Sequence, residues 1–387
     1  MRILELAVGA GIVAATWLSL VASLVMPRGL RSSYTRLVHG AVRWPFQFAA
    51  DRCHTYDAKD RALAWAAPLG ILVTLISWLA FFLAGFGLLL AGASGLSLNG
   101  AFREAGSSLF TLGFASSARD RLTFLDFAAA ATGPVAIALQ IGYLPALYSA
   151  YSRREAEVTL LQARAGVPAW GPEILSRHVQ VVGLRENLPD LYRGWERWAA
   201  EISESHTNYP VLIHFRSPQP NRNWLIALLA VMDAAALELA LNPSNRDAGA
   251  IRIGLRGGFT CLRDIAHMER IPYDPDPDPD SDIQLSFEEF SQGIDMLRYG
   301  GYPTERSPEE AWPHFRGWRV NYEATAYALA YRIDAVPAPW SGPRRTPGQL
   351  VRVRTPRDRQ PTKGVPAETS TTPVHKTPDQ SPRESRS

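Results

Sequence analysis

The stretch LAWAAPLGILVTLISWLAFFLAGFGLLL, residues 63–90, decides the fold of this chain. It contains no charged residue, and the charge-free run around it extends over residues 62–102. A bilayer core about 30 Å thick is crossed by roughly 20 mostly apolar helical residues. Backbone groups in lipid must hydrogen-bond to one another, so this stretch predicts a membrane-spanning helix.

Two further charge-free runs are also long enough to cross a bilayer. They are residues 6–27 and residues 127–152. An alternative for the first run is a cleaved signal peptide, because Arg2 precedes it and small residues lie near Ala22. The length of the run, Glu5 and the basic sequence that follows favour a retained membrane anchor. We therefore predict three membrane helices.

The charge distribution predicts the orientation. The chain has 40 Lys and Arg against 37 Asp and Glu, a formal net charge of +3, which does not indicate a nucleic-acid partner. Basic residues gather in residues 28–61 and directly after residue 152. The positive-inside rule then predicts an N-terminus outside and a cytoplasmic C-terminal part. The predominance of Arg over Lys and the high Ala content suggest a bacterial genome, hence the inner membrane.

The link between the second and third runs, residues 92–121, is more apolar than an external loop should be. It predicts a short helix over residues 100–110, followed by a tight extended segment at residues 111–115. Irregular backbone at membrane depth is tolerated where protein or a water-filled cavity surrounds it. The pattern therefore favours a re-entrant loop. The alternative is a turn packed on the membrane surface.

In its order of outer helix, short helix, extended segment and inner helix, residues 62–152 resemble the two-transmembrane pore-loop potassium channels. Their Thr-x-Gly-Tyr-Gly filter corresponds here to Thr111, Leu112, Gly113, Phe114 and Ala115. The resemblance implies that backbone carbonyls of this segment replace the water shell of a potassium ion. Phe replaces the usual Tyr, and Ala replaces the second Gly, where a left-handed conformation would cost about 1 kcal/mol.

The resemblance also has implications for assembly and gating. One filter segment cannot surround an ion, so it implies a homotetramer in membrane lipid. It implies a gating bend in the third helix, for which Gly133 and Pro134 are the candidates because Pro interrupts helical hydrogen bonding. No cofactor other than the permeant ion is implied.

The remaining chain predicts a mostly α-helical cytosolic domain and a basic tail. The run Trp224–Leu241 is apolar enough for a fourth span, but Asp233 and Glu238 favour a buried soluble helix. Residues 336–387 hold ten Lys and Arg against four Asp and Glu and are rich in Pro, Ser and Thr, which predicts disorder. The predicted parts are a membrane helix (1–27), a cytosolic loop (28–61), a pore domain (62–152, with pore helix and filter at 100–115), a helical domain (153–335) and a tail (336–387).

These patterns favour an α-helical membrane protein that conducts potassium passively, with the cytosolic domain gating or assembling the pore. Two other functions stay open. One is a non-conducting sensor or scaffold that retains the loop. The other is a membrane-tethered metal-dependent enzyme, which requires His206, His214, Asp264 and His267 to converge. No cytosolic ligand is indicated.

Overall fold

Helices make up the regular structure of the computed structural model, which describes residues 2–26, 33–116, 122–181 and 184–342. Within these residues there is no strand, so the prediction of a mostly α-helical protein is confirmed. The first six helices are α1 (Arg2–Leu24), α2 (Ser33–Ala50), α3 (Tyr56–Ala64), α4 (Ala66–Ser94), α5 (Leu98–Leu109) and α6 (Thr123–Ala165). The later ones are α7 (Gly171–Gln180), α8 (Leu188–Asn208), α9 (Trp224–Leu241), α10 (Ala248–Glu269), α11 (Phe287–Tyr299), α12 (Pro308–Arg319) and α13 (Glu323–Arg332).

Four segments are long and apolar enough to cross a membrane: α1, the joined helices α3 and α4, α6, and α9. They differ in their surroundings. Every residue of α9 is buried, and α7, α8, α10, α12 and α13 pack around it. A helix that is apolar on all sides is suited to a protein core as well as to lipid. The other three segments leave most of their apolar surface uncovered in the single chain.

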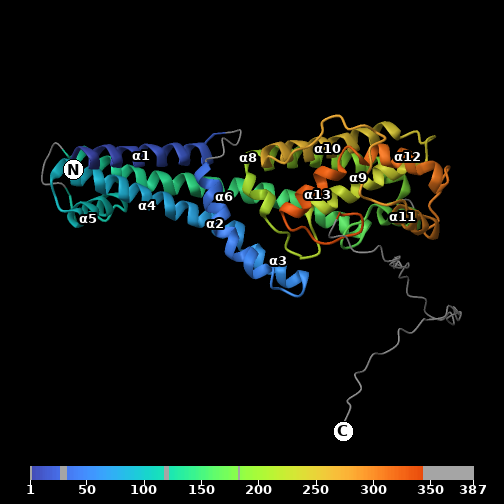
Figure 1. Cartoon of the computed structure of the whole chain (residues 1–387), viewed down its shortest axis with the longest axis horizontal. Helices are drawn as coiled ribbons and strands as arrows, with labels where there is room; N and C mark the ends of the chain where they lie inside the picture. The colour runs from blue at the N-terminus through green and yellow to red at the C-terminus, as the bar shows by residue number, and fades with distance from the viewer. Residues whose placement is uncertain (1, 27–32, 117–121, 182–183, 343–387) are drawn as a thin grey trace, which may run out of the picture. The chain divides into compact units, whose positions relative to one another are not determined.

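Helices α1, α4, α5 and α6 share one hydrophobic core, at the end of the molecule that carries the N-terminus (Figure 1). Trp78, Phe82 and Phe86 of α4 are almost fully buried in it, and Trp17 of α1 packs against Phe82 with ring centroids 5.5 Å apart. The indole nitrogen of Trp78 donates to Ser19 Oγ at 3.1 Å. Packing of large rings and one polar contact therefore joins α1 to α4.

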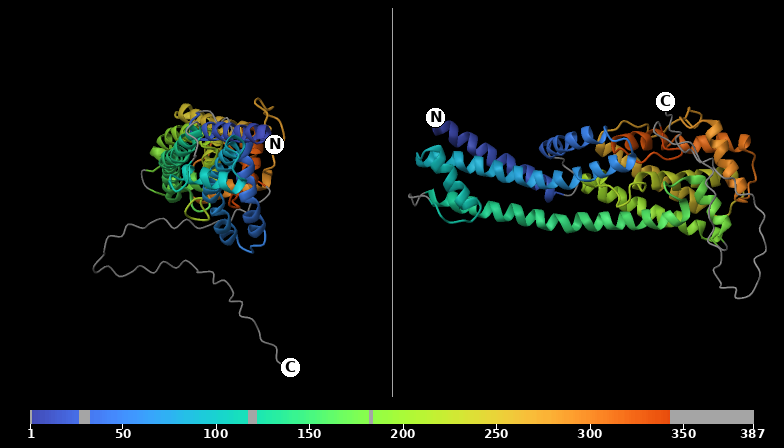
Figure 2. Two further views of the ribbon diagram at one scale, coloured as in Figure 1. Left: turned by 90° about the vertical axis from the view of Figure 1, so that its left-hand side faces the viewer. Right: turned by 90° about the horizontal axis from the view of Figure 1, so that it is seen from below.

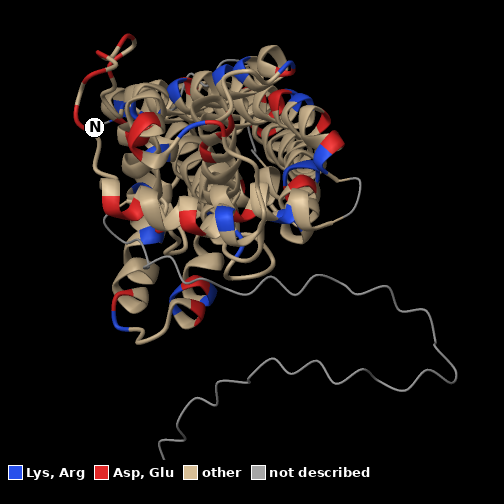
Figure 3. Ribbon diagram, turned by 90° about the vertical axis from the view of Figure 1, so that its right-hand side faces the viewer, with Lys and Arg blue, Asp and Glu red and all other residues tan. Residues whose placement is uncertain are grey.

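Helix α6 connects this core to the helical domain formed by α7–α13. Its 43 residues correspond to about 65 Å at 1.5 Å per residue, far more than a bilayer core requires. Its later part extends among the domain's helices, where Arg154, Val158 and Leu161 are buried (Figure 2). At the far end of the domain, charges of both signs are interspersed (Figure 3).

Two predicted boundaries differ from the structure. Residues 28–61, expected as a loop, contain α2 and α3. Val336, Ala338 and Trp340, predicted as part of the tail, are buried in the helical domain. The ring of Trp340 packs against Phe315 at 5.5 Å between centroids, so this segment completes the domain's core. The rest of the predicted tail, residues 343–387, lies outside the described residues.

Candidate pore-loop site

Helix α5 is the predicted short helix, and it turns back along α4 (Figure 1). It begins at Ser97, whose side chain accepts a hydrogen bond from Gly100 N. A Cβ atom placed on Gly87 of α4 would lie 2.9 Å from the ring of Phe102. One placed on Gly106 would lie 3.5 Å from Leu83. From Phe102 to Gly106 the chain of α5 moves toward its C-terminus, whereas the contacting residues of α4 move from Gly87 back to Leu83. The two helices therefore run antiparallel.

The carboxyl end of α5 meets α6 at Gly133. A Cβ atom on Gly133 would lie 1.9 Å from the carbonyl oxygen of Leu109, so only glycine allows this approach. Gly133 lies about 15 Å along α6 from its first residue, Thr123, at 1.5 Å per residue. This is about half the thickness of a bilayer core. The segment after Leu109 therefore starts beside α6, about 15 Å along that helix from its first residue.

Ser107 holds the predicted filter segment in place. Its carbonyl oxygen accepts hydrogen bonds from the backbone nitrogens of Leu112 at 2.8 Å and Gly113 at 3.3 Å. Its hydroxyl accepts from Ala115 N at 2.9 Å. One residue of α5 thus organises the following segment up to Ala115. Ser107 was not predicted as a site residue, although a small polar residue in the last turn of the helix before the loop is a signal that could have revealed it.

Left-handed backbone occurs at Thr111, with φ 54°, and at Gly113, with φ 71°. The non-glycine residue with left-handed backbone in this segment is Thr111, and Ala115 does not have a positive φ. A left-handed L-residue costs roughly 1–2 kcal/mol. Such strain persists where the surroundings impose the conformation, which is common at functional sites. The two left-handed residues alternate with Leu112, the kind of alternation the filter analogy requires.

The tip of the loop is apolar and uncovered in the single chain. The side chains of Phe110, Leu112 and Phe114 are 44%, 63% and 55% exposed. The guanidinium carbon of Arg103 lies 5.4 Å from the centre of the Phe114 ring. Exposed apolar patches mark contact surfaces for lipid or other protein chains.

The electrostatic environment behind the loop favours positive charge. The carboxyl end of a helix carries partial negative charge, and that end of α5 is followed directly by the loop. Two carboxylates, Glu104 and Asp126, are buried in this region, and Ser108 Oγ donates to Asp126 at 3.1 Å. Arg103, whose guanidinium lies over the Phe114 ring, supplies positive charge at this loop.

The two candidate hinge residues differ in their surroundings. Gly133 is buried against Leu109, whereas Pro134 is exposed in the interior of a helix that continues without a break to Ala165. Close packing accounts for glycine at position 133. A gating role for this pair stays a prediction.

The residues of the enzyme alternative have separate partners. The ring of His206 lies 3.3 Å from Arg154 Nη1, His214 Nδ1 lies 3.0 Å from Arg43 Nη1, and Asp264 accepts from Ser203 Oγ at 2.6 Å. His267 lies in the last turn of α10. Among the residues that the structure describes, no group of three His, Cys, Asp or Glu side chains could hold a metal ion. The convergence that a metal-dependent enzyme requires is therefore not met.

His206 gives the helical domain a defined pH response. Burial, and then the charge of Arg154, lower the pKa of His206 well below its usual value. A histidine whose pKa is lowered by folding stabilises the fold above its unfolded pKa of about 6.5, and this contribution is lost as the pH falls.

We expect the free energy of unfolding to decrease by about 1.4 kcal/mol per pH unit below pH 6.5 through this group. Denaturation of the wild type and of His206→Gln between pH 5 and pH 7.5 measures the difference. Equal slopes for the two proteins would contradict a buried neutral imidazole.

No protein-family model, curated protein or solved structure matches this chain.

Proposed function

We propose that this chain is one subunit of a pore-loop cation channel. The observation that carries the proposal is the contact between Leu109 O and Gly133, which starts the loop beside α6. We place this point inside the bilayer, about 9 Å past the start of the charge-free run at Phe127. A loop at that depth, preceded by the negative end of a helix, suits a cation that has lost its water. Thr111 and Gly113 supply the alternating backbone that a carbonyl-lined filter needs.

In this proposal α1, α4 and α6 cross the bacterial inner membrane. The N-terminus lies outside, and helices α7–α13 form the cytoplasmic domain. The basic residues between α1 and α4, and Arg153 and Arg154 after the third span, support this orientation. Helix α9 stays in the cytoplasmic core, because a fourth crossing would expose its buried Asp233 and Glu238 to lipid.

Four chains would complete the pore. An exposed apolar stripe on one face of α6 supports assembly. Its residues recur at helical spacing and are Phe127, Ala131, Val135, Ala138 and Ile141. In the tetramer this stripe faces the central opening or a neighbouring subunit. The exposed loop tip then contacts the loop tips of the other three subunits at the four-fold axis. The permeant ion in this proposal is potassium, as the filter resemblance implies.

Cation flux into liposomes tests the proposal. We expect the reconstituted full-length chain to pass potassium, and Gly113→Val to reduce the flux to that of empty liposomes. A β-branched residue is strongly disfavoured at positive φ. Gly194→Ala on α8 of the helical domain is the control, because a Cβ atom there meets nothing within 4 Å and the residue lies away from the α6 stripe. It should conduct as the wild type does.

The second candidate is a non-conducting membrane scaffold. Ala115 at the position of the family's second filter glycine favours it. In that case the wild type and both variants pass no cation, although they still assemble. Comparison of potassium and sodium gradients would measure selectivity if flux is present.

A further inference from the structure

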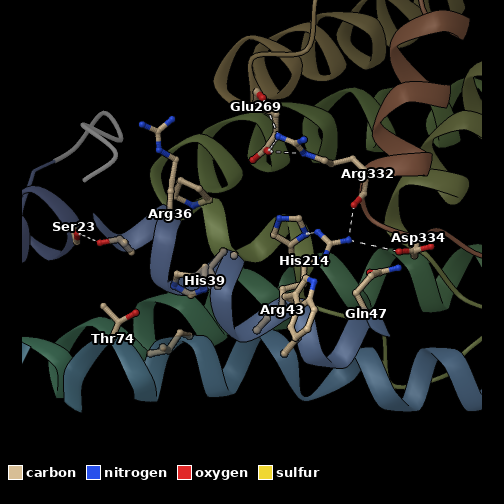
Figure 4. Close-up of a pocket in the computed structure, with 18 of the residues that line it drawn as sticks. Ser23, Arg36, His39, Arg43, Gln47, Thr74, His214, Glu269, Arg332 and Asp334 are labelled. Atoms are coloured by element: carbon tan, nitrogen blue, oxygen red, sulfur yellow. Dashed lines mark hydrogen bonds and ion pairs between the residues drawn. The ribbon is translucent and has the colours of Figure 1, made fainter. Parts of the chain in front are cut away.

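A large cavity lies where the helical domain meets the ends of α1, α2 and α4 (Figure 4). Its volume is about 960 Å³, in the range of pockets that enclose small molecules. Its walls come from α1, α2, α4 and α6 on one side. On the other side they come from the 3₁₀ helix Pro210–His214, the end of α10, and α13. The proposed pore loop is not part of it.

One wall of the cavity is apolar and belongs to the spanning helices. Ala22 and Leu24 of α1 line it together with Ile71 and Trp78 of α4. Trp78 lies about 24 Å along α4 from the helix end at Ser94, at 1.5 Å per residue. The cavity therefore opens near the opposite boundary of a bilayer core about 30 Å thick.

The other wall is cationic. Arg36, His39 and Arg43 follow one another on successive turns of α2, and Lys59 and Arg332 also line the cavity (Figure 4). The spacing of three and four residues directs the three α2 side chains to one face. Basic pockets of this kind on the cytoplasmic side of spanning helices are suited to anionic lipid head groups.

The carboxylates that line the cavity neutralise only part of this positive charge. Glu269 pairs with Arg332 at 3.2 Å, and Asp334 pairs with Lys59 at 2.8 Å and with Arg43 at 3.7 Å. Asp51, the third lining carboxylate, also pairs with Lys59, at 3.2 Å. Arg36 has no ion pair within the described part of the chain, and its guanidinium donates to Ser33 Oγ at 3.2 Å. Arg36 is thus available for an anion.

We propose that this cavity binds a membrane lipid with an anionic head group. The head group lies against Arg36 and His39, and an acyl chain extends along Ala22, Ile71 and Trp78. The proposal requires that these helices span a bilayer, and it does not require that the protein conducts ions. Lipid binding and cation flux are therefore tested separately.

The experiment uses the full-length chain in detergent, titrated with phosphatidylglycerol or with phosphatidylcholine of the same acyl chains. Bound lipid is measured by native mass spectrometry and by the thermal midpoint of unfolding. We expect phosphatidylglycerol to stay bound and to raise the midpoint, as any ligand of the folded state does. Phosphatidylcholine, and inorganic phosphate alone, should do neither.

Substitutions test the contributions of the cationic wall and the apolar wall separately. Arg36→Ala should weaken phosphatidylglycerol binding about fivefold, the effect of one Arg near an anionic lipid. Arg36→Lys should keep the affinity, and Ala22→Trp should block the apolar wall and abolish binding. The matched control is Arg61→Ala, an exposed arginine of α3 that does not line the cavity.

Four outcomes would overturn the proposal. The first is equal binding of both lipids, and the second is equal weakening by Arg36→Ala and Arg61→Ala, which would indicate general surface attraction. The third is unchanged binding by a folded Ala22→Trp protein. The fourth is a midpoint shift with inorganic phosphate as large as that with phosphatidylglycerol. It would show that the site binds phosphate alone and would contradict the proposal of a lipid site.

Discussion

Gly133→Leu is expected to abolish cation flux completely while leaving the helix content unchanged. Even the first side-chain atom at position 133 would lie 1.9 Å from the carbonyl oxygen of Leu109, which is backbone and cannot move aside alone. The whole end of α5 must then shift, and with it Ser107, which holds the loop through three hydrogen bonds. Close-packed interiors do not absorb such a displacement without cost.

Flux assays on reconstituted Gly133→Leu, Gly133→Ala and Gly194→Ala measure the effect. Gly133→Ala should already remove most of the flux, because the clash arises at Cβ. Gly194→Ala lies on α8 with open space around it and should be indistinguishable from the wild type. If Gly133→Leu conducts normally, α5 does not sit against α6 as described, and the proposed pore loop loses its basis.

Arg319→Met is expected to produce the largest loss of stability in the helical domain. The guanidinium of Arg319 is fully buried and pairs with Asp233 of α9 and with Glu323, the latter at 2.9 Å. It also donates to Trp340 O at 2.7 Å and to the Tyr327 hydroxyl at 2.8 Å. It thus joins α9, α12, α13 and the segment that follows them.

Removing this cation leaves Asp233 and Glu323 buried without their counterion. Breaking a buried ion pair from one side typically costs 3–5 kcal/mol. Thermal or denaturant unfolding, followed by circular dichroism, should show the loss as a large decrease of the midpoint. Arg319→Lys should restore part of the lost stability, because lysine supplies the positive charge but not the forked hydrogen-bond donors of a guanidinium.

Arg316→Met is the control on the same helix. Arg316 pairs with Asp280 at 3.1 Å, but the side chain of Asp280 is 91% exposed. A surface pair of this kind contributes roughly 0–1 kcal/mol. If Arg316→Met and Arg319→Met lower the midpoint equally, the buried network is not what stabilises the domain.

The long helices could be predicted from the sequence, because each depends on a local property. Residues 6–27, 62–102 and 127–152 lack charge over a length that only a helix can satisfy in lipid, and they became α1, α4 and α6. The short helix before residue 111 was also expected, and α5 occupies that position. Asp233 and Glu238 correctly indicated that α9 is enclosed by protein, because carboxylates need partners that lipid lacks.

The contacts between distant residues could not be predicted. The pairs Arg319–Asp233 and Trp340–Phe290 join segments that the chain separates widely, and periodicity in one helix contains no information about its neighbour. For the same reason the composition of residues 336–342 indicated a tail, whereas the ring of Trp340 packs among aromatic side chains of the helical domain. The cavity between α2 and the helical domain likewise arises only when these elements pack together.

The sequence by itself determined that this is a helical protein with apolar segments of membrane length, since hydrophobicity and helical hydrogen bonding act within a single stretch of chain. The tertiary structure decided where the loop sits. The seating of Leu109 against Gly133 and the strain at Thr111 rather than Ala115 depend on how three helices pack, and packing is a property of surfaces that meet only after folding.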